Sequence, residues 1–119
     1  MVVTACATAP DAKEMIYVGS LMHDCKSIVN HKSIVSIPEN FTLRPLEAAA
    51  IFQKNSSYGC LIKMGFSVYA DNHNYYIVNN NQLAFKSINA DAIKKFSFII
   101  DAQSGKLLSI PDYERRRRP

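Results

Sequence analysis

The chain lacks several residue types and patterns on which common functions depend. Its 119 residues contain no tryptophan, only four glycines and only three cysteines. The few glycines, with no Gly-x-Gly-x-x-Gly or P-loop pattern, argue against a phosphate-binding loop. No apolar run reaches the roughly 18 residues that a membrane-spanning helix needs, and no Cys-x-x-Cys pattern supports a zinc or thioredoxin-like site. The sequence therefore predicts neither a metal site nor a cofactor.

Net positive charge is confined to one short segment. The formal net charge is +4, and Arg115 to Arg118 carry four positive charges, so the rest of the chain is neutral overall. Nucleic-acid-binding domains carry a basic face, and the neutral body argues against a nucleic-acid partner. We expect residues 113–119 to form a solvated basic tail. Contact of this tail with anionic lipid or an acidic partner is the alternative.

Catalytic constellations are missing as well. His23, Asp24 and Cys25 are adjacent, but neighbours in a strand point to opposite faces, so adjacency does not build a nucleophile and its base. His31 and His73 are isolated, and the chain has no His-x-x-x-His or Glu-x-x-His spacing. The ten carboxylates are scattered along the sequence. We therefore expect a protein that is not an enzyme.

What is present begins at Val3-Thr4-Ala5-Cys6, which precedes a short Ala- and Pro-containing stretch. This arrangement resembles the lipobox of bacterial lipoproteins, where a small residue precedes the cysteine and a flexible tether follows. The resemblance implies a lipid anchor at Cys6 and a location on the periplasmic side of the bacterial envelope. Only five residues precede Cys6, too few for the charged start and apolar run of a secretory signal. A truncated lipoprotein signal and an ordinary chain terminus both stay open.

The cysteine count fits the same location. If Cys6 carries a lipid, Cys25 and Cys60 remain as one pair, and an oxidising compartment favours a disulfide between them. Such a bond closes a loop of tens of residues, which is worth on the order of 4 kcal/mol. Two separate buried thiols are the alternative.

One segment carries a strong helical pattern. Leu46, Ala49 and Ala50 follow helical spacing, and Thr42 is the expected N-cap. Pro45 lies in the first turn, where its missing N–H matters little. The pattern predicts a helix that ends near Asn55.

Segments of strand type lie before and after this helix. They are expected at 15–18, 33–37, 58–64, 66–70, 75–78, 83–88, 96–100 and 106–110. The stretches 71–74 and 102–105 have the composition of hairpin turns, and Asn89 is expected to cap a short helix over 90–95.

Consecutive hairpins with one strong helix predict an α+β fold. We expect an antiparallel sheet of about four to six strands with one main helix packed on one face. The 48% hydrophobic content suits one domain with its own core, which we expect over 14–112. The tether is expected over 1–13 and the tail over 113–119. The expected core consists of Leu46, Ala49, Ala50, Ile62, Phe66, Val68, Phe98 and Ile100.

Two segments carry a further family resemblance. Leu46-Glu47-Ala48-Ala49-Ala50 and the closing Asp101-Ala102-Gln103-Ser104-Gly105-Lys106 resemble a PepSY-type domain. Such domains combine a helix containing a Glu-Ala pair, antiparallel strands and a strand that ends in Asp-Ala-x-Thr/Ser-Gly-Lys. The resemblance covers part of the chain, and 75–95 is longer than the family usually allows. It implies an extracytoplasmic module that binds or restrains other proteins without chemistry of its own.

Tyrosines provide the candidate binding residues. Tyr69, Tyr75 and Tyr76 cluster in the predicted hairpin, and one of the adjacent pair should face away from the core. Exposed tyrosines are favoured at protein interfaces, while ordinary strand packing is the alternative. With Asn80 in the neighbouring polar turn, they form the predicted partner-binding surface.

The predicted function follows from these features. We expect an envelope lipoprotein that binds another protein, such as a toxin, a hydrolase or an envelope component, as an inhibitor or immunity protein. A structural or assembly lipoprotein of the outer membrane is the alternative. A small ligand-binding or enzymatic domain is less favoured.

Overall fold

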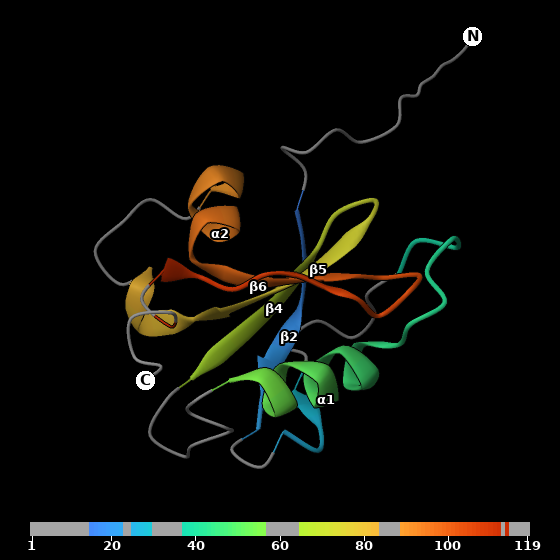
Figure 1. Ribbon diagram of the computed structural model, residues 1–119, viewed down its shortest axis with the longest axis horizontal. Helices are drawn as coiled ribbons and strands as arrows, with labels where there is room; N and C mark the ends of the chain where they lie inside the picture. Colours follow the sequence, from blue (N-terminus) through green and yellow to red (C-terminus); the bar gives the residue numbers. More distant parts are fainter. Residues whose placement is uncertain are drawn as a thin grey trace, which may run out of the picture.

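A computed structural model describes residues 15–22, 25–29, 37–56, 65–83, 89–112 and 114 (Figure 1). The elements in chain order are β2 (Ile16–Leu21), β3 (Ile28–Val29), α1 (Pro45–Asn55), β4 (Phe66–Ala70), β5 (Asn74–Asn79), the 3₁₀ turn η1 (Asn80–Gln82), α2 (Ala90–Phe96), β6 (Ser97–Asp101) and β7 (Leu107–Ser109). The described strands form one antiparallel sheet in the order β3-β2-β4-β5-β6-β7. The predicted α+β class, with a helix packed on an antiparallel sheet, is confirmed.

The β4–β5 hairpin turns on Asp71, as its composition predicts. One oxygen of this carboxylate, Oδ1, accepts hydrogen bonds from the backbone amides of His73 and Asn74, both at 2.9 Å. These bonds satisfy amides that the tight turn would otherwise leave without partners. The turn fixes a register in which Tyr69 lies opposite Tyr76.

The β6–β7 hairpin uses the same device. Asp101 Oδ1 accepts from the amides of Gln103 and Ser104, at 2.8 and 2.9 Å. Gly105 follows with φ 77°, the left-handed conformation that glycine adopts without a steric penalty. The predicted turn at 102–105 is therefore confirmed.

Helix α1 covers one face of the sheet with its buried residues Ala48, Ala49 and Phe52. The Phe52 ring packs against Phe66 and Phe98, with ring centroids 4.8 Å apart in both pairs. Phe66 and Phe98 are buried as predicted, and Val68, Ile100 and Ala49 are also in the core.

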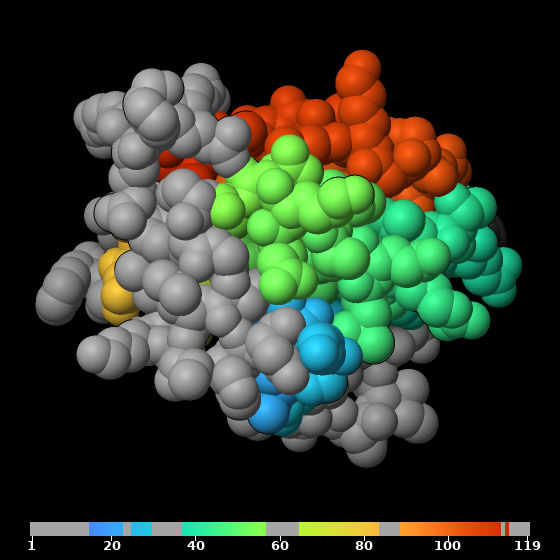
Figure 2. All heavy atoms as spheres, turned by 60° about the horizontal axis from the view of Figure 1, so that its bottom comes forward, coloured from blue at the N-terminus to red at the C-terminus, as the bar shows by residue number. Residues whose placement is uncertain are grey.

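The prediction that Leu46 and Ala50 of α1 belong to the core is wrong. Leu46 is 46% exposed, and Ala50 is exposed as well. The reason is Phe52, the largest apolar side chain of the helix. Burial of Phe52 brings the residues three and four positions earlier, Ala49 and Ala48, onto the same face. Leu46 and Ala50 then lie on the solvent side of the helix, and Figure 2 shows that α1 (green) forms part of the molecular surface.

The predicted N-cap is also wrong. The Thr42 hydroxyl donates to the Gln103 carbonyl at 2.7 Å, so it does not cap the helix. Arg44 occupies the N-cap position and Pro45 follows it. The Arg44 backbone N–H donates to Glu47 Oε1 at 2.6 Å, which is the glutamate half of a capping box.

Helix α2 lies on the opposite face of the sheet, above β5 and β6 in Figure 1. Asn89 caps it as predicted, because its side chain accepts from the Ala92 amide at 2.9 Å. Ile93 is buried, and its carbonyl accepts from the Ser97 hydroxyl. This second layer over β5 means that side chains on both faces of that strand are buried.

Some expectations fall on residues that the structure does not describe. These are the strand at 58–64, most of 33–37, the core candidate Ile62, and the terminal segments 1–14 and 115–119. Of the strand predicted at 83–88, only Leu83 is described, and it lies in a turn. Among the described residues, no helix is both long and apolar enough to cross a membrane.

Candidate functional site

The expectation that Tyr75 or Tyr76 faces solvent is wrong. Tyr75 is 0% exposed and Tyr76 is 3% exposed. They do point to opposite faces, but α1 covers one face and α2 covers the other. The Tyr75 hydroxyl donates to the Leu43 carbonyl at 2.8 Å, and the Tyr76 hydroxyl donates to Asp71 Oδ2 at 2.6 Å. Both tyrosines are therefore structural, with satisfied hydroxyl groups.

The pKa values of these phenols follow from their burial. Burial, and then the bond to Asp71, raise the pKa of Tyr76 well above its ordinary value. Burial, and then the charge of Glu47, raise the pKa of Tyr75 to about 12, while the charge of Arg44 opposes the rise. Arg44 and Glu47 thus lie near the hydroxyl end of Tyr75.

Tyr69 stays at the surface, and it lies beside a tyrosine that is not among the predicted binding residues. Tyr69 and Tyr17 face each other across β4 and β2, with ring centroids 5.4 Å apart and planes at 59°. Both are half-buried. Burial, and then the neighbouring Tyr17, raise the pKa of Tyr69. The position of Tyr17 between two apolar residues of the first strand was the signal that it faces away from the core.

Polar groups lie beside this tyrosine pair. Asn80, a predicted site residue, is exposed and its Oδ1 accepts from the Ser67 hydroxyl at 2.6 Å. Ser67 pairs in register with Ser20, and Ser20 pairs with Val29, which is 42% exposed. We call this surface the tyrosine face: Tyr17, Ser20, Val29, Ser67, Tyr69 and Asn80.

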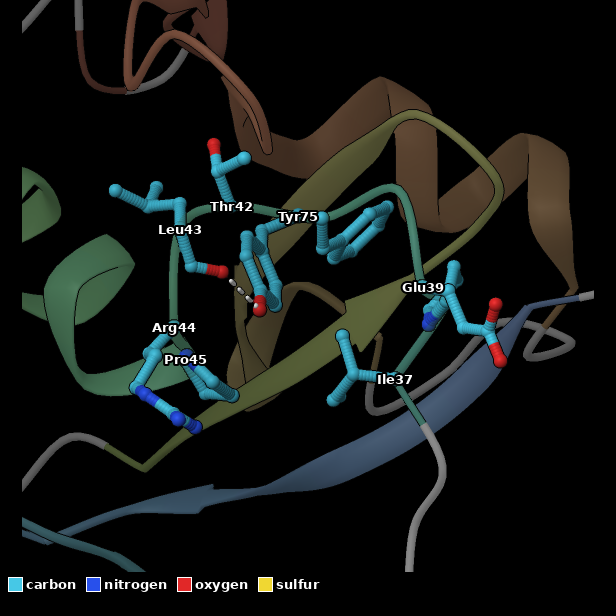
Figure 3. Close-up of a pocket in the computed structure, with 9 residues that line it drawn as sticks. Ile37, Glu39, Thr42, Leu43, Arg44, Pro45 and Tyr75 are labelled. Atoms are coloured by element: carbon cyan, nitrogen blue, oxygen red, sulfur yellow. Dashed lines mark hydrogen bonds between the residues drawn. The ribbon is translucent and has the colours of Figure 1, made fainter.

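A pocket of about 250 Å³ lies beside the N-terminal end of α1, on the face of the sheet opposite to the tyrosine face (Figure 3). It is lined by Ile37, Pro38, Glu39, Phe41, Thr42, Leu43, Arg44, Pro45 and Tyr75. The Phe41 ring meets the Tyr75 ring edge-on at a centroid distance of 5.1 Å. Figure 3 shows the side chains of Glu39 and Arg44 on opposite sides of the pocket.

Hydrogen bonds fix the irregular segment that forms the pocket. The Asn40 side chain donates to the Asn72 carbonyl, and the Asn40 carbonyl accepts from the Gln103 side chain, both at 3.1 Å. The Thr42 amide donates to the Ala102 carbonyl at 3.2 Å. These bonds join the pocket wall to both hairpin turns. Sequence patterns missed the pocket because Pro38-Glu39-Asn40 predicts only a turn.

Cys25 is 5% exposed, has φ 57° and takes part in a disulfide. Its predicted partner Cys60 lies outside the described residues, so the Cys25–Cys60 pairing stays a prediction. The lipidation candidate Cys6 also lies outside them. Within the described part of the chain, no three His, Cys, Asp or Glu side chains gather closely enough to hold a metal ion.

The chain matches no family model, and neither curated proteins nor solved structures show significant similarity to it. The resemblance of α1 and the final hairpin to PepSY-type domains stays a sequence-based expectation. The tyrosine face and the pocket are the two candidate sites that the geometry offers.

Proposed function

We propose that this chain is a non-enzymatic domain that binds another protein through the tyrosine face. The pair Tyr17–Tyr69 carries the proposal, because two half-buried rings lie side by side on adjacent strands at 5.4 Å. Tyrosine combines a large apolar ring with a hydroxyl and few rotatable bonds, and it is enriched where proteins bind one another.

The surroundings of the pair support the same use. Ser67 lies two positions before Tyr69 on the same face of β4, and its buried hydroxyl donates to the exposed Asn80 side chain. The Tyr17 hydroxyl lies 2.6 Å from the Ser20 hydroxyl. Val29 adds an exposed aliphatic side chain. An aromatic centre with hydrogen-bonding neighbours matches the anatomy of protein interfaces.

The proposed location is the bacterial envelope. The pattern Val3-Thr4-Ala5-Cys6 supports a lipid anchor at Cys6, and a disulfide at Cys25 is typical of an oxidising compartment. The proposed partner is a toxin or hydrolase that the domain inhibits. In bacteria producing the chain, a clickable fatty-acid label should attach to it and should be lost in Cys6→Ala.

Photo-crosslinking tests the binding surface. A benzoylphenylalanine placed at Tyr69 of the full chain, in cells, should capture a defined protein. The same probe at Gln53, an exposed residue of α1 on the opposite face, serves as the control and should not capture it.

Affinity measurements then complete the test. Against the captured protein in purified form, Tyr69→Ala should weaken binding at least about tenfold, while Gln53→Ala should leave it unchanged. Equal capture from both positions, or equal affinity of both variants, contradicts the proposal. Capture of a membrane assembly in place of a soluble toxin or hydrolase supports the structural-lipoprotein alternative.

A further inference from the structure

We propose that the pocket in front of α1 binds a short apolar peptide with free termini, whose carboxylate meets Arg44 and whose amine meets Glu39. This site lies on the α1 face of the sheet and does not involve the tyrosine face. It therefore goes beyond the proposed function and is independent of it.

The apolar character of the ligand follows from the lining. Ile37 and Phe41 are only partly buried against the core, so both leave apolar surface toward the pocket, whereas the Leu43 side chain points away from it toward Gly105. The edge of the buried Tyr75 ring completes this surface. An apolar side chain placed there removes these groups from water, which favours binding.

The termini of the ligand follow from two charges. Glu39 and Arg44 are both exposed and line opposite sides of the pocket. No ion pair joins either side chain to another residue in the described ranges. Arg44 also stands at the N-terminal end of α1, where the helix dipole favours a negative group. A ligand that is negative at one end and positive at the other is complementary to this pair.

The size of the pocket sets the length of the peptide. At about 250 Å³, it is smaller than the pockets of roughly 300–1,000 Å³ that hold drug-sized molecules. A single amino acid carries its amine and carboxylate on one carbon, whereas Glu39 and Arg44 lie on opposite sides of the pocket. Two or three residues separate the charges and still place one apolar side chain between them.

The pocket is also held in shape before any ligand arrives. Its wall is bonded to both hairpin turns through Asn40 and Thr42, and the Tyr75 hydroxyl fixes the Leu43 carbonyl. Binding to a preformed site loses less conformational entropy.

Nuclear magnetic resonance titration tests the proposal on the full ¹⁵N-labelled chain. The probes are the dipeptide Leu-Phe, its N-acetyl form and its C-terminal amide. Leu-Phe should shift the backbone amide signals of Phe41, Leu43 and Arg44 in a saturable way. Blocking either terminus should weaken binding at least about threefold, as expected for one exposed charge pair.

Charge variants assign each terminus. Arg44→Gln should abolish the preference for the free carboxylate, and Glu39→Gln should abolish the preference for the free amine. Lys54→Gln and Asp91→Asn remove charges from exposed residues outside the pocket. These two matched controls should keep both preferences.

Three results would overturn the proposal. They are equal affinity for the three peptides, shifts confined to amides outside the pocket, and an Arg44→Gln profile identical to that of Lys54→Gln. Tyr69→Ala should bind the dipeptide normally, and Arg44→Gln should bind the crosslinked partner normally. Failure at one surface is therefore distinguishable from failure at the other.

Discussion

Phe52 determines how the core is assembled at the scale of single residues. It is the only aromatic residue of α1 and is fully buried between Phe66 and Phe98. Edge-on and tilted contacts of this kind add to the energy of burial. The two alanines on the same face of α1 let the helix approach the sheet closely.

The buried position of Phe98 leads us to expect a large loss of stability when its side chain is truncated. Phe98→Ala should lower the free energy of unfolding by roughly 3–5 kcal/mol, because a buried ring is lost and a cavity remains. Denaturant unfolding monitored by circular dichroism measures this change. Leu46→Ala, at an exposed position of α1, should change the free energy by less than about 0.5 kcal/mol. Equal losses in the two variants would contradict the orientation of α1.

Tyr76 predicts a decline of stability at alkaline pH. Burial and the bond to Asp71 raise the pKa of Tyr76 in the folded protein, while the unfolded chain releases the phenol proton near pH 10. The folded state then binds more protons than the unfolded state, so the free energy of unfolding falls as pH rises above about 10. The contribution of neutral Tyr76 is complete below that pH.

Denaturant unfolding at about pH 9 and about pH 11 checks this prediction. Tyr76→Phe should reduce the difference between the two pH values, because it removes the phenol that retains its proton. Tyr17→Phe is the control for loss of a tyrosine on the same face. An undiminished difference in Tyr76→Phe would show that other groups cause the decline.

At the scale of elements, the hairpin turns are built from local chemistry. Each turn begins with an aspartate whose Oδ1 accepts hydrogen bonds from two backbone amides. The amides of Ser104 and Gln103 hold the pKa of Asp101 below its ordinary value. Such short-range bonds depend on few neighbours, which is why both turns could be predicted from composition.

Gly105 provides a test of the final hairpin. Gly105→Ala should lower the free energy of unfolding by about 1–2 kcal/mol, because a residue with a Cβ is strained at φ 77°. The added Cβ would lie 3.4 Å from Ile51 Cδ1, an ordinary contact, so the loss comes from the backbone. Gly105→Asn should lose less, since asparagine tolerates this conformation. Thermal unfolding compares the two variants, and equal losses would argue against a backbone origin.

The sequence predicted the elements better than the faces they bury. Asn89, Asp71 and Gly105 act on their immediate neighbours, and α2 and both turns were predicted correctly. The orientation of α1 was wrong because spacing alone does not weigh Phe52 against Leu46. Nothing local to Tyr76 indicates that α2, beginning at residue 90, packs against β5 on the face opposite to α1.

The candidate site was harder to predict than the fold. Tyr69 and Asn80 were placed at the surface correctly, whereas Tyr17 joins them only through the pairing of β2 with β4. The pocket arises where an irregular segment meets two turns, and no periodic pattern marks such a junction.

At the scale of the whole molecule, the sheet joins distant parts of the chain. β2 pairs with β4, which lies about fifty positions later in the sequence; Ile16, for example, pairs with Ala70. A covalent bond between Cys25 and Cys60 would shorten the free loop that separates these strands in the unfolded chain, and so favour their pairing.

That disulfide is the prediction at this scale. In a Cys6→Ser background, protein made in an oxidising compartment should have a mass two hydrogens below the reduced value and should resist alkylation. Reduction should lower the free energy of unfolding by on the order of 4 kcal/mol. Two alkylatable thiols in the folded protein, or an unchanged unfolding transition after reduction, would contradict the pairing.

The bonds that hold the pocket wall have a consequence for the order of folding. Thr42 bonds Gln103 across 61 positions, and Gln103 bonds Asn40 across 63. A nascent chain therefore presents Phe41 and α1 long before the last hairpin exists to receive them. Contacts so distant in sequence make folding slow, and these contacts cannot form before Gln103 has been synthesised. Until the final hairpin is present, Phe41 and α1 lack the contacts that bury them, and the chain cannot complete its fold.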